Sequence, residues 1–436
     1  MPTPRPSPDW LDRKVASLPP SPTLAMNELA MAVAASGQRI FRLGFGRSPF
    51  PVPDPVVEAL RQNAHQGDYL PVRGLPALRA AAAEHASRHA GVAYDAEQVL
   101  IGPGSKELMF LVQIALQAEL LIPSPAWVSY APQATVAGRR VTWLPTRRED
   151  RWQLEPDLLR ASLRGAGNRP RLLLLNYPNN PNGATMAPER LKAIGAIARA
   201  HGLLVLADEI YGLVDHAGTH VSMASVYPEG TLVSTGLSKW CGAGGWRLGT
   251  MLLPRELAWL GDTLATLAGE TYSCVSAPIQ HAAVVAFRGG PAIDLYLRHV
   301  RRILGALGRH VASALSARGF LVDAPEGGFY VFPDAAPFAG SLASTRNVTT
   351  AALLCDRLLE ETGVAVLPGS AFGRPPEELT FRLSYVDFDG RSALRASQER
   401  PDGPLDRTWL RANCPQVLEG VTRLTSWVGE PVALGV

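Results

Sequence analysis

The chain has 436 residues, with 47% hydrophobic residues and a formal net charge of +3 at pH 7. This length exceeds one ordinary core and predicts two domains, and the hydrophobic content is that of a globular protein. The arginines are spread over expected helices rather than gathered in a stripe, so we expect no nucleic-acid partner.

The N-terminus, the longest apolar region and the cysteines together predict a cytoplasmic protein. The start, MPTPRPSPDW, is proline-rich and polar, which argues against a secretory signal. The apolar region of residues 108–123 is interrupted by Gln113, Gln117 and Glu119, so we expect core and no membrane partner. Four widely spaced cysteines without a CxxC pair fit a reduced compartment and predict neither a disulfide framework nor a zinc site.

The first part of the chain is poor in periodic structure. We expect its first ~45 residues to form an arm or to pack against a second domain, because they cannot bury a core alone. From residue 99 onward, short apolar runs alternate with helix-period stretches such as SKELMFLVQIAL and PERLKAIGAIARAHG, the second ending at a C-cap glycine, Gly202. The runs are VLIG, ELLIP, RLLLLNYP, LLVLADE and TLVSTGLS. Near-continuous apolar strands predict an α/β domain with a mainly parallel sheet covered by helices on both faces.

The pattern changes after a long amphipathic helix expected over residues 292–319. GGFYVFP, AALLCDRLLEET, VAVLPG and the alternating LTFRLSY predict a second, smaller α+β domain. We therefore assign residues 54–290 to a large domain, and residues 1–53 and 291–436 to a small domain with an N-terminal arm. Residues 396–415, around SQERPDGPLDRTWLRANCP, read as an inserted loop.

Candidate chemical groups follow the expected strands. In open parallel sheets ligands bind beyond the carboxyl ends of the strands, so the residues just after each apolar run are the ones to inspect. These residues are the GPGSK loop of 102–106, Trp127, Asn180, Asp208 and Lys239.

Each of these features has an ordinary alternative. The glycine loop could be a simple turn, and NNPNG is a β-turn on any interpretation. Asp208 could cap the following helix, and Arg382 in LTFRLSY could be a half-exposed strand residue. Lys239 alone could be a solvated surface charge. None of these residues decides the function by itself.

The combination of these residues, and their order along the chain, says more about function than any one of them. A glycine loop opening a helix suits a phosphate, an aromatic ring can stack on a flat cofactor, and Asp208 is followed three residues later by Tyr211. A carboxylate for a pyridine nitrogen, hydrogen bonds for a phenolic oxygen and an amine for an aldehyde complete the set. These are the parts needed to hold pyridoxal 5′-phosphate.

From about residue 41 to the C-terminus the sequence resembles the class I/II aminotransferases, pyridoxal-phosphate enzymes of fold type I with the aspartate-aminotransferase fold. The resemblance rests on LGFGRSPFPVP, YLPVRGLPALR, NYPNNPNG, ADEIY, SKWCGAGGWRLG, LPGSAFG and FRLSY. It departs from the family pattern at Asn182, where the turn usually has threonine, and at Gly236, where serine often stands three residues before the lysine.

The resemblance implies a role for each matching residue around the cofactor ring. Lys239 would form the Schiff base and carry the proton between Cα and C4′, while Asp208 would keep the ring nitrogen protonated. Tyr211 and Asn180 would bond the 3′-oxygen, and Trp127 would stack on the ring.

The resemblance also implies contacts to the phosphate and the substrate. Arg382 would grip the substrate α-carboxylate near the Gly46 backbone. Tyr69 would reach the phosphate from the second subunit of a homodimer. The residues surrounding the phosphate within one chain would be Gly104, Ser105, Lys106, Ser238 and Arg247.

The implied activity is transfer of an α-amino group from an amino acid to a 2-oxo acid, with aspartate, another dicarboxylic or an aromatic amino acid as candidate donors. Lys106 could bind a distal carboxylate or be an exposed helix-start lysine. The alternative within enzymes is a pyridoxal-phosphate enzyme of specialised metabolism that catalyses elimination, replacement, C–C bond formation or oxidation.

Three other function classes fit less well. A transcription regulator would need an upstream helix-turn-helix, which the N-terminus lacks. A dinucleotide-binding dehydrogenase would need GxGxxG, whereas Gly242 and Gly244 give GxGxxR. His85 and His89 are four residues apart but lack a third ligand, so we expect solvated helix positions and no metal.

Overall fold

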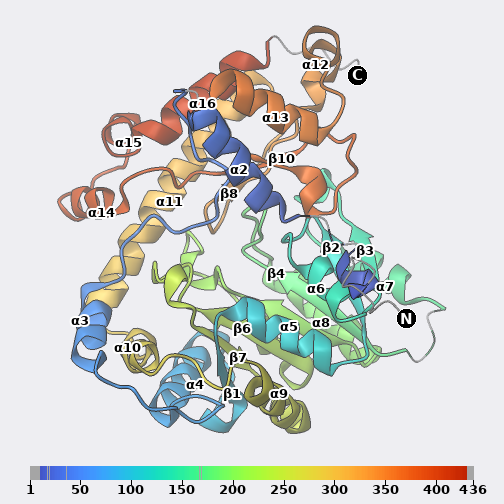
Figure 1. Cartoon of the computed structure of the whole chain (residues 1–436), viewed down its shortest axis with the longest axis vertical. Helices are drawn as coiled ribbons and strands as arrows, with labels where there is room; N and C mark the ends of the chain where they lie inside the picture. Colours follow the sequence, from blue (N-terminus) through green and yellow to red (C-terminus); the bar gives the residue numbers. More distant parts are fainter. Residues whose placement is uncertain are drawn as a thin grey trace, which may run out of the picture.

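The computed structural model describes residues 10–429 except residues 17, 19, 36, 166 and 168. A seven-stranded sheet forms the centre of the larger part of the molecule, in the order β1-β7-β6-β5-β4-β2-β3 (Figure 1). The strands are β1 (Val99–Gly102), β2 (Glu119–Ser124), β3 (Val141–Pro145), β4 (Arg171–Asn176), β5 (Leu204–Asp208), β6 (Thr231–Gly236) and β7 (Gly249–Leu252). Only β7 runs antiparallel to its neighbours, so the predicted mainly parallel sheet is confirmed.

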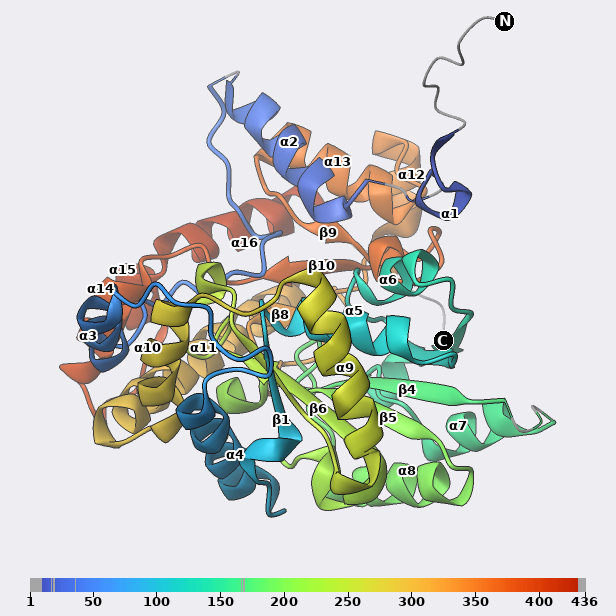
Figure 2. The same cartoon turned by 60° about the horizontal axis from the view of Figure 1, so that its bottom comes forward.

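Helices cover both faces of this sheet, which explains the uninterrupted apolar strands. In β2, Leu120 and Ile122 join the core beneath one set of helices, while Leu121 between them joins the core on the other face. In Figure 2, α5 and α8 lie on opposite sides of the strands. The first face packs against α5 (Ser105–Ala115), α6 (Tyr130–Val136) and α9 (Ala258–Thr271); the second face packs against α7 (Pro156–Leu163), α8 (Pro188–Ala200), α4 (Pro76–Ala90) and α10 (Ala277–Arg288).

A 28-residue helix, α11 (Pro291–Arg318), runs from the larger part into the smaller one (Figure 1). It buries the apolar face that its periodicity predicts, from Ile293 to Leu315. The smaller part contains a three-stranded antiparallel sheet of β8 (Tyr330–Val331), β10 (Phe381–Ser384) and β9 (Leu367–Pro368). Its helices are α12 (Ala339–Arg346), α13 (Ala351–Thr362), α14 (Gly390–Gln398), α15 (Arg407–Asn413) and α16 (Pro415–Trp427).

The N-terminal helices lie on different parts of the molecule. The first, α1 (Arg13–Ala16), contacts α6, whereas α2 (Pro22–Ala35) packs against α13 and β9. Figures 1 and 2 both show α2 beside α13. The next helix, α3 (Asp54–Asn63), packs on α10. The division into residues 54–290 and the remainder stays a prediction.

Two local expectations were wrong. The expected inserted loop contains α15, because the Asp406 carboxylate caps the helix at the Trp409 N–H and the Trp409 side chain anchors it in the core. His85 is half-buried against the rings of Trp240 and Phe287 rather than solvated, and burial lowers its pKa to about 3, whereas His89 is exposed as expected. Among the described helices, none is both long and apolar enough to span a membrane.

Candidate active site

A cavity of about 830 Å³ opens at the carboxyl ends of the central parallel strands. This is the edge at which open α/β sheets bind ligands. Most of the residues predicted from the sequence line this one cavity. They are Gly46, Ser105, Lys106, Trp127, Asn180, Asp208, Tyr211, Ser238, Lys239 and Arg247.

Lys239 follows β6 and lies inside this cavity. Its Nζ donates a hydrogen bond of 2.6 Å to the Gly46 carbonyl and lies 5.6 Å from the centre of the Tyr211 ring. Burial, together with the nearby Arg382 guanidinium, lowers the pKa of Lys239 to about 8, although the Asp208 carboxylate acts in the opposite direction. The amine is therefore uncharged, and nucleophilic, in far more molecules near neutral pH than a surface lysine would be.

Asp208 ends β5 and is almost completely buried. Its Oδ2 accepts a hydrogen bond of 2.7 Å from the Tyr130 hydroxyl, and its Oδ1 accepts one of 3.3 Å from the Ile210 N–H. Burial raises the pKa of Asp208 to about 6, against the lowering effect of these two hydrogen bonds. A carboxylate held in this way is suited to pair with a protonated ring nitrogen.

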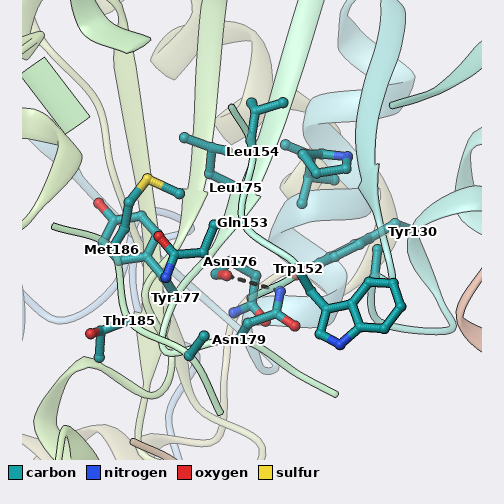
Figure 3. Close-up of a pocket in the computed structure, with 14 residues that line it drawn as sticks. Tyr130, Trp152, Gln153, Leu154, Leu175, Asn176, Tyr177, Asn179, Thr185 and Met186 are labelled. Atoms are coloured by element: carbon teal, nitrogen blue, oxygen red, sulfur yellow. Dashed lines mark hydrogen bonds between the residues drawn. The ribbon is translucent and has the colours of Figure 1, made fainter. Parts of the chain in front are cut away.

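Tyr130 is a site residue that the sequence reasoning missed. It is the first residue of α6, three positions after Trp127 in SPAWVSY, and that spacing is the only signal the sequence offered. Figure 3 shows Tyr130 with Asn176 and Trp152 around a neighbouring cavity of about 30 Å³. Neither Lys239 nor Asp208 lines that smaller space, and its volume suits water rather than an amino acid.

Arg382 reaches the site from β10 in the smaller part of the molecule. Its guanidinium donates to Asn180 Oδ1 at 3.0 Å and to the Gly44 carbonyl at 2.7 Å. It lies over the rings of Tyr330 and Phe372, at 4.6 and 5.0 Å from their centres. The half-exposed alternative for Arg382 is wrong, since the side chain is only 3% exposed because both faces of β10 are buried.

The buried charge of Arg382 is not fully matched by the protein. Its Nε is buried without a hydrogen-bond partner among the described residues, and burial lowers its pKa from the ordinary value. A buried guanidinium with an unpaired donor is costly unless an anion completes it. The planar fork is suited to a carboxylate.

Tyr211 and Tyr330 form a second buried pair that the sequence did not reveal. Their hydroxyl oxygens lie 2.9 Å apart and their rings meet edge to face. A side chain at Gly46 would place its Cβ 2.1 Å from the Tyr330 hydroxyl, so Gly46 allows the close approach of its backbone. The only sequence signal for Tyr330 was its place in the apolar run GGFYVFP.

A cradle for an anion lies at the start of α5. Gly104 has φ +96° just before the helix, and a Cβ there would lie 2.1 Å from Arg247 Nη2. Arg247 donates to the carbonyls of Gly244 and Pro103 at 3.0 and 3.1 Å, which holds the guanidinium over this loop. The first N–H groups of a helix lack acceptors within it, so they, the Ser238 hydroxyl and Arg247 together fit a phosphate.

A family model described as aminotransferase class I and II matches residues 38–389. The chain belongs to this family. As a class I/II aminotransferase it is a pyridoxal-phosphate-dependent transaminase that acts on amino acids and 2-oxo acids. The donor set of the cavity fits that cofactor, since it offers an amine, a buried carboxylate, an aromatic ring and an anion cradle.

Proteins of similar sequence or structure that are named as aminotransferases support this family assignment. The aspartate aminotransferase of Geobacillus stearothermophilus is 32% identical over 89% of this chain and 97% of its own length. The aspartate/prephenate aminotransferase of Thermus thermophilus is also 32% identical, with the same coverage. Among solved structures, the aspartate aminotransferase of Rhizobium meliloti matches with a TM-score of 0.82 and 27% identity, covering 97% of this chain and 99% of that one.

Three of the predicted site residues of this aminotransferase do not line the cavity. Gly104 and Arg382 do not line the cavity themselves, but each contacts a residue that does, Arg247 and Asn180 respectively. Tyr69 does neither: it is 91% exposed and lies outside the cavity of its own chain. The single chain thus assembles the predicted site except for Tyr69.

Lys106 and Trp127 form one wall of the aminotransferase cavity. Lys106 Nζ lies 5.0 Å from the centre of the Trp127 ring, and that ring packs edge-on against Tyr130. Burial and the neighbouring Arg247 lower the pKa of Lys106. Lys106 is thus an exposed lysine at the start of α5, and it also lines the cavity, so both sequence alternatives for it stay open.

Proposed function

We propose that this aminotransferase accepts an amino group from aspartate or another dicarboxylic amino acid and transfers it to a 2-oxo acid, with Lys239 as the proton carrier. The observation that carries the proposal is the placement of one half-buried amine of lowered pKa in the same cavity as Asp208, beside a guanidinium that lacks an anion. Aspartate is named for the similar proteins of Geobacillus stearothermophilus and Thermus thermophilus.

Bound pyridoxal phosphate supplies an aldehyde and an electron-withdrawing ring that stabilises negative charge at the substrate Cα. Lys239 would hold the cofactor through its aldehyde until a substrate amine takes the place of the lysine. The free Lys239 amine would then be the general base and acid that carries the proton between Cα and C4′. The Gly46 carbonyl, 2.6 Å from Nζ, holds the released amine beside the reacting atoms.

Asp208 and its neighbours support this proton transfer. In the proposal Asp208 receives the ring N–H, and the Tyr130 hydroxyl fixes the carboxylate in place. Tyr211 and Asn180 donate to the 3′-oxygen, and Trp127 covers the ring. Burial of these groups strengthens each contact, because the local dielectric is low.

The remaining cations bind the two anionic ends. Arg382 binds the substrate α-carboxylate through its unpaired Nε edge, near the Gly46 backbone. Lys106 lies where it can bind either the phosphate or the distal carboxylate of a dicarboxylic substrate. The phosphate group is held by Gly104, Ser105, Ser238 and Arg247, with Lys106 as the further candidate.

We include a homodimer in the proposal. Tyr69 is predicted to contact the phosphate, yet its side chain is 91% exposed and does not line the cavity of its own chain. A second copy that supplies Tyr69 would account for both observations, since exposed large aromatic side chains are enriched at interfaces. Loss of cofactor on dilution, with Tyr69→Phe weakening the cofactor in mixed dimers, would support this arrangement.

The test begins with the purified holoenzyme and single amino acids. Loss of the cofactor's aldehyde absorbance with release of the matching 2-oxo acid supports transamination, whereas release of a side-chain group would support elimination or replacement instead. Borohydride reduction followed by peptide mass spectrometry should place the cofactor on Lys239. Lys239→Ala should lose at least about a thousandfold in rate, because it removes the general base.

Lys192→Ala is the matched control, because Lys192 is an exposed lysine on α8 outside the cavity. It should retain the activity and the labelled peptide of the unchanged enzyme. If Lys239→Ala still carried a reducible covalent cofactor, the role proposed for Lys239 would be wrong.

A further inference from the structure

A second cavity, of about 170 Å³, lies on the face of the sheet that α4 and α10 cover. Its floor consists of two cross-strand pairs between β6 and β7, Val233 with Leu252 and Thr235 with Thr250. Its walls come from α4, α10, α11 and the loop after β5, and we refer to it as the α4 cavity. Within the described part of the chain, no residue lines both this cavity and the active-site cavity.

Small side chains on α4 leave this space open. Ala82, Ala86 and Ala90 line it and are spaced four residues apart, so they lie on one face of the helix. Each contributes only a methyl group, where a larger side chain would fill the gap between α4 and Val233. Protein cores are close-packed, and gaps larger than a water molecule are few. A gap of this size is therefore a candidate for a ligand.

Two hydroxyl groups at the α4 cavity lack hydrogen-bond partners. Thr250 is fully buried and lines the cavity, and its Oγ1 has no partner among the residues that the structure describes. The same holds for the hydroxyl of Tyr94, which also lines the cavity. A buried polar group without a partner costs about 1–3 kcal/mol. A hydroxyl can both donate and accept, so a ligand with one polar group can satisfy either of them.

The acidic group of the α4 cavity is already bonded by the protein. Glu209 is buried, and its Oε1 accepts from the Ser222 hydroxyl at 2.8 Å and from the Met223 N–H at 3.0 Å. Its Oε2 lies 3.0 Å from His220 Nε2. A cationic ligand would have to displace these donors to reach the carboxylate.

The basic groups of the α4 cavity leave no unmatched charge for an anion. Arg301 Nε donates to a backbone carbonyl at 2.8 Å. Burial lowers the pKa of Arg301, while the charges of Asp215 and Asp294 act in the opposite direction, so both carboxylates lie near it. Burial also lowers the pKa of His85, to about 3, and that of His89, so both imidazoles are mainly uncharged at neutral pH. Because a charged ligand would lose its hydration without gaining an opposite charge, the cavity favours an uncharged one.

Two rings shape the α4 cavity for a flat molecule. His85 and Phe287 both line it, edge to face, with their ring centres 5.5 Å apart. Such rings pack well against a further aromatic ring. An apolar cavity of about 150 Å³ holds one benzene molecule, so about 170 Å³ suits one six-membered ring with a small substituent. The exposed residues His89 and Gly218 mark its rim.

We propose that the α4 cavity is a second binding site, which takes a small uncharged aromatic molecule with one hydroxyl group, a phenol. The ring fills the space between Ala86 and Phe287, and its hydroxyl bonds Thr250 Oγ1 or the Tyr94 hydroxyl. This inference goes beyond the proposed function, because it concerns a site that the amino-group transfer does not use.

The experiment measures binding of phenol and of benzene to the holoenzyme by titration calorimetry. Ala86→Leu should weaken both ligands by at least about tenfold, because the larger side chain occupies the space of the ring. The double variant Thr250→Val with Tyr94→Phe removes both unpartnered hydroxyls. It should weaken phenol by about three- to tenfold, the scale of one hydrogen bond, and leave benzene unchanged.

Two matched controls test whether these losses are local. Ala80→Leu makes the same change at an exposed alanine of α4 that does not line the cavity. Thr380→Val removes another buried hydroxyl without a described partner, in the smaller part of the molecule. Both should bind phenol as the unchanged enzyme does. Thermal unfolding confirms that each variant is folded, and a crystal soaked with phenol should show the ring beside Ala86.

The outcomes separate this inference from the proposed function. If phenol does not bind saturably, or binds Ala86→Leu as well as the unchanged enzyme, the second site is wrong while transamination stands. If benzoate displaces phenol with equal affinity, the preference for an uncharged ligand is wrong. Equal losses of phenol and benzene in the double variant would overturn the role of the hydroxyls. If the enzyme does not transaminate but phenol binding still depends on Ala86, the proposed reaction is wrong and the second site stands.

Discussion

The Tyr130 hydroxyl donates a hydrogen bond of 2.7 Å to the Asp208 carboxylate, and this bond joins the first turn of α6 to the end of β5. Both side chains are buried, and burial with the adjacent carboxylate raises the pKa of Tyr130 well above its ordinary value. Tyr130 therefore stays a donor throughout the working pH range, and Asp208 stays oriented toward the cavity.

Removing that donor should change the ionisation of Asp208. In Tyr130→Phe the lost hydrogen bond lets the pKa of Asp208 rise above about 6, so more of the carboxyl is protonated at pH 7. We expect cofactor affinity to fall by about five- to a hundredfold at pH 7, the scale of an unpaired buried acceptor. Titration of the apoenzyme with cofactor from pH 6 to 8 measures this, and the deficit should shrink as pH rises.

Tyr94→Phe is the control for a lost hydroxyl, because the Tyr94 hydroxyl is buried without a partner among the described residues. It should leave cofactor affinity unchanged. An equal loss in both variants would mean that the Tyr130 hydroxyl acts through packing and not through Asp208.

Lys239 should give the apoenzyme a pH-dependent capture of the cofactor. With a pKa of about 8, its free-amine fraction rises roughly tenfold between pH 7 and 9 and then levels off. An ordinary lysine would continue to gain above pH 9. Stopped-flow rates of covalent attachment against pH should show this plateau, and their midpoint should fall in Asp208→Asn, because the Asp208 charge raises the pKa of Lys239.

The lowered pKa of Lys239 also makes the stability of the apoenzyme depend on pH. The folded apoenzyme releases the Lys239 proton at a lower pH than the unfolded chain, so this group makes stability rise with pH between about 8 and its ordinary pKa. Lys239→Met should therefore stabilise the apoenzyme most below pH 8. Chemical unfolding at pH 7 and 10 checks this, and an equal gain at both pH values would contradict it.

Gly46 should not tolerate a side chain while Tyr330 keeps its hydroxyl. The added Cβ of Gly46→Ala would lie 2.1 Å from that oxygen, and overpacking of this kind costs about 1–3 kcal/mol. Tyr330→Phe should recover part of the loss, since it removes the clashing atom. Gly245→Ala is the control, because its Cβ meets nothing within 4 Å. Additive losses in the double variant would show that the two positions are not coupled.

Gly104→Ala should damage the anion cradle more than the fold. Its φ of +96° disfavours a side chain, and the new Cβ would displace Arg247 Nη2. We expect at least a tenfold weaker affinity for cofactor, from loss of about 1.4 kcal/mol at the phosphate. Equilibrium titration with pyridoxal phosphate and with phosphate-free pyridoxal distinguishes the two ends: only the first should weaken. Gly340→Ala, at an open helix position, should change neither.

Much of this fold and site was predictable from local sequence. The five apolar runs became strands because each has consecutive apolar residues for two helical layers, as Leu172 and Leu173 do in β4. Parallel strands then bring their carboxyl ends to one edge, which gathers Asn180, Asp208 and Lys239 into one cavity.

The missed features depend on distant contacts. Tyr330 and Arg382 belong to the small sheet, and their meeting with Tyr211 and Asn180 joins residues 119 and 202 positions apart. The polar residues on β10 resembled a solvated strand face because alternation cannot show that another layer covers them. Likewise, β7 was not predicted, and its pairing with β1 joins Leu252 to the distant Val99.

The backbone between Gly44 and Gly46 fixes the spacing of two hydrogen-bond acceptors. Its two carbonyls receive the Arg382 guanidinium and the Lys239 amine, yet they are only two residues apart and span roughly 7 Å at full extension. The covalent bonds between Gly44 and Gly46 thus limit how far the Arg382 guanidinium can lie from the Lys239 amine while both keep these hydrogen bonds. A shift of this short segment would therefore move the acceptors of both side chains together.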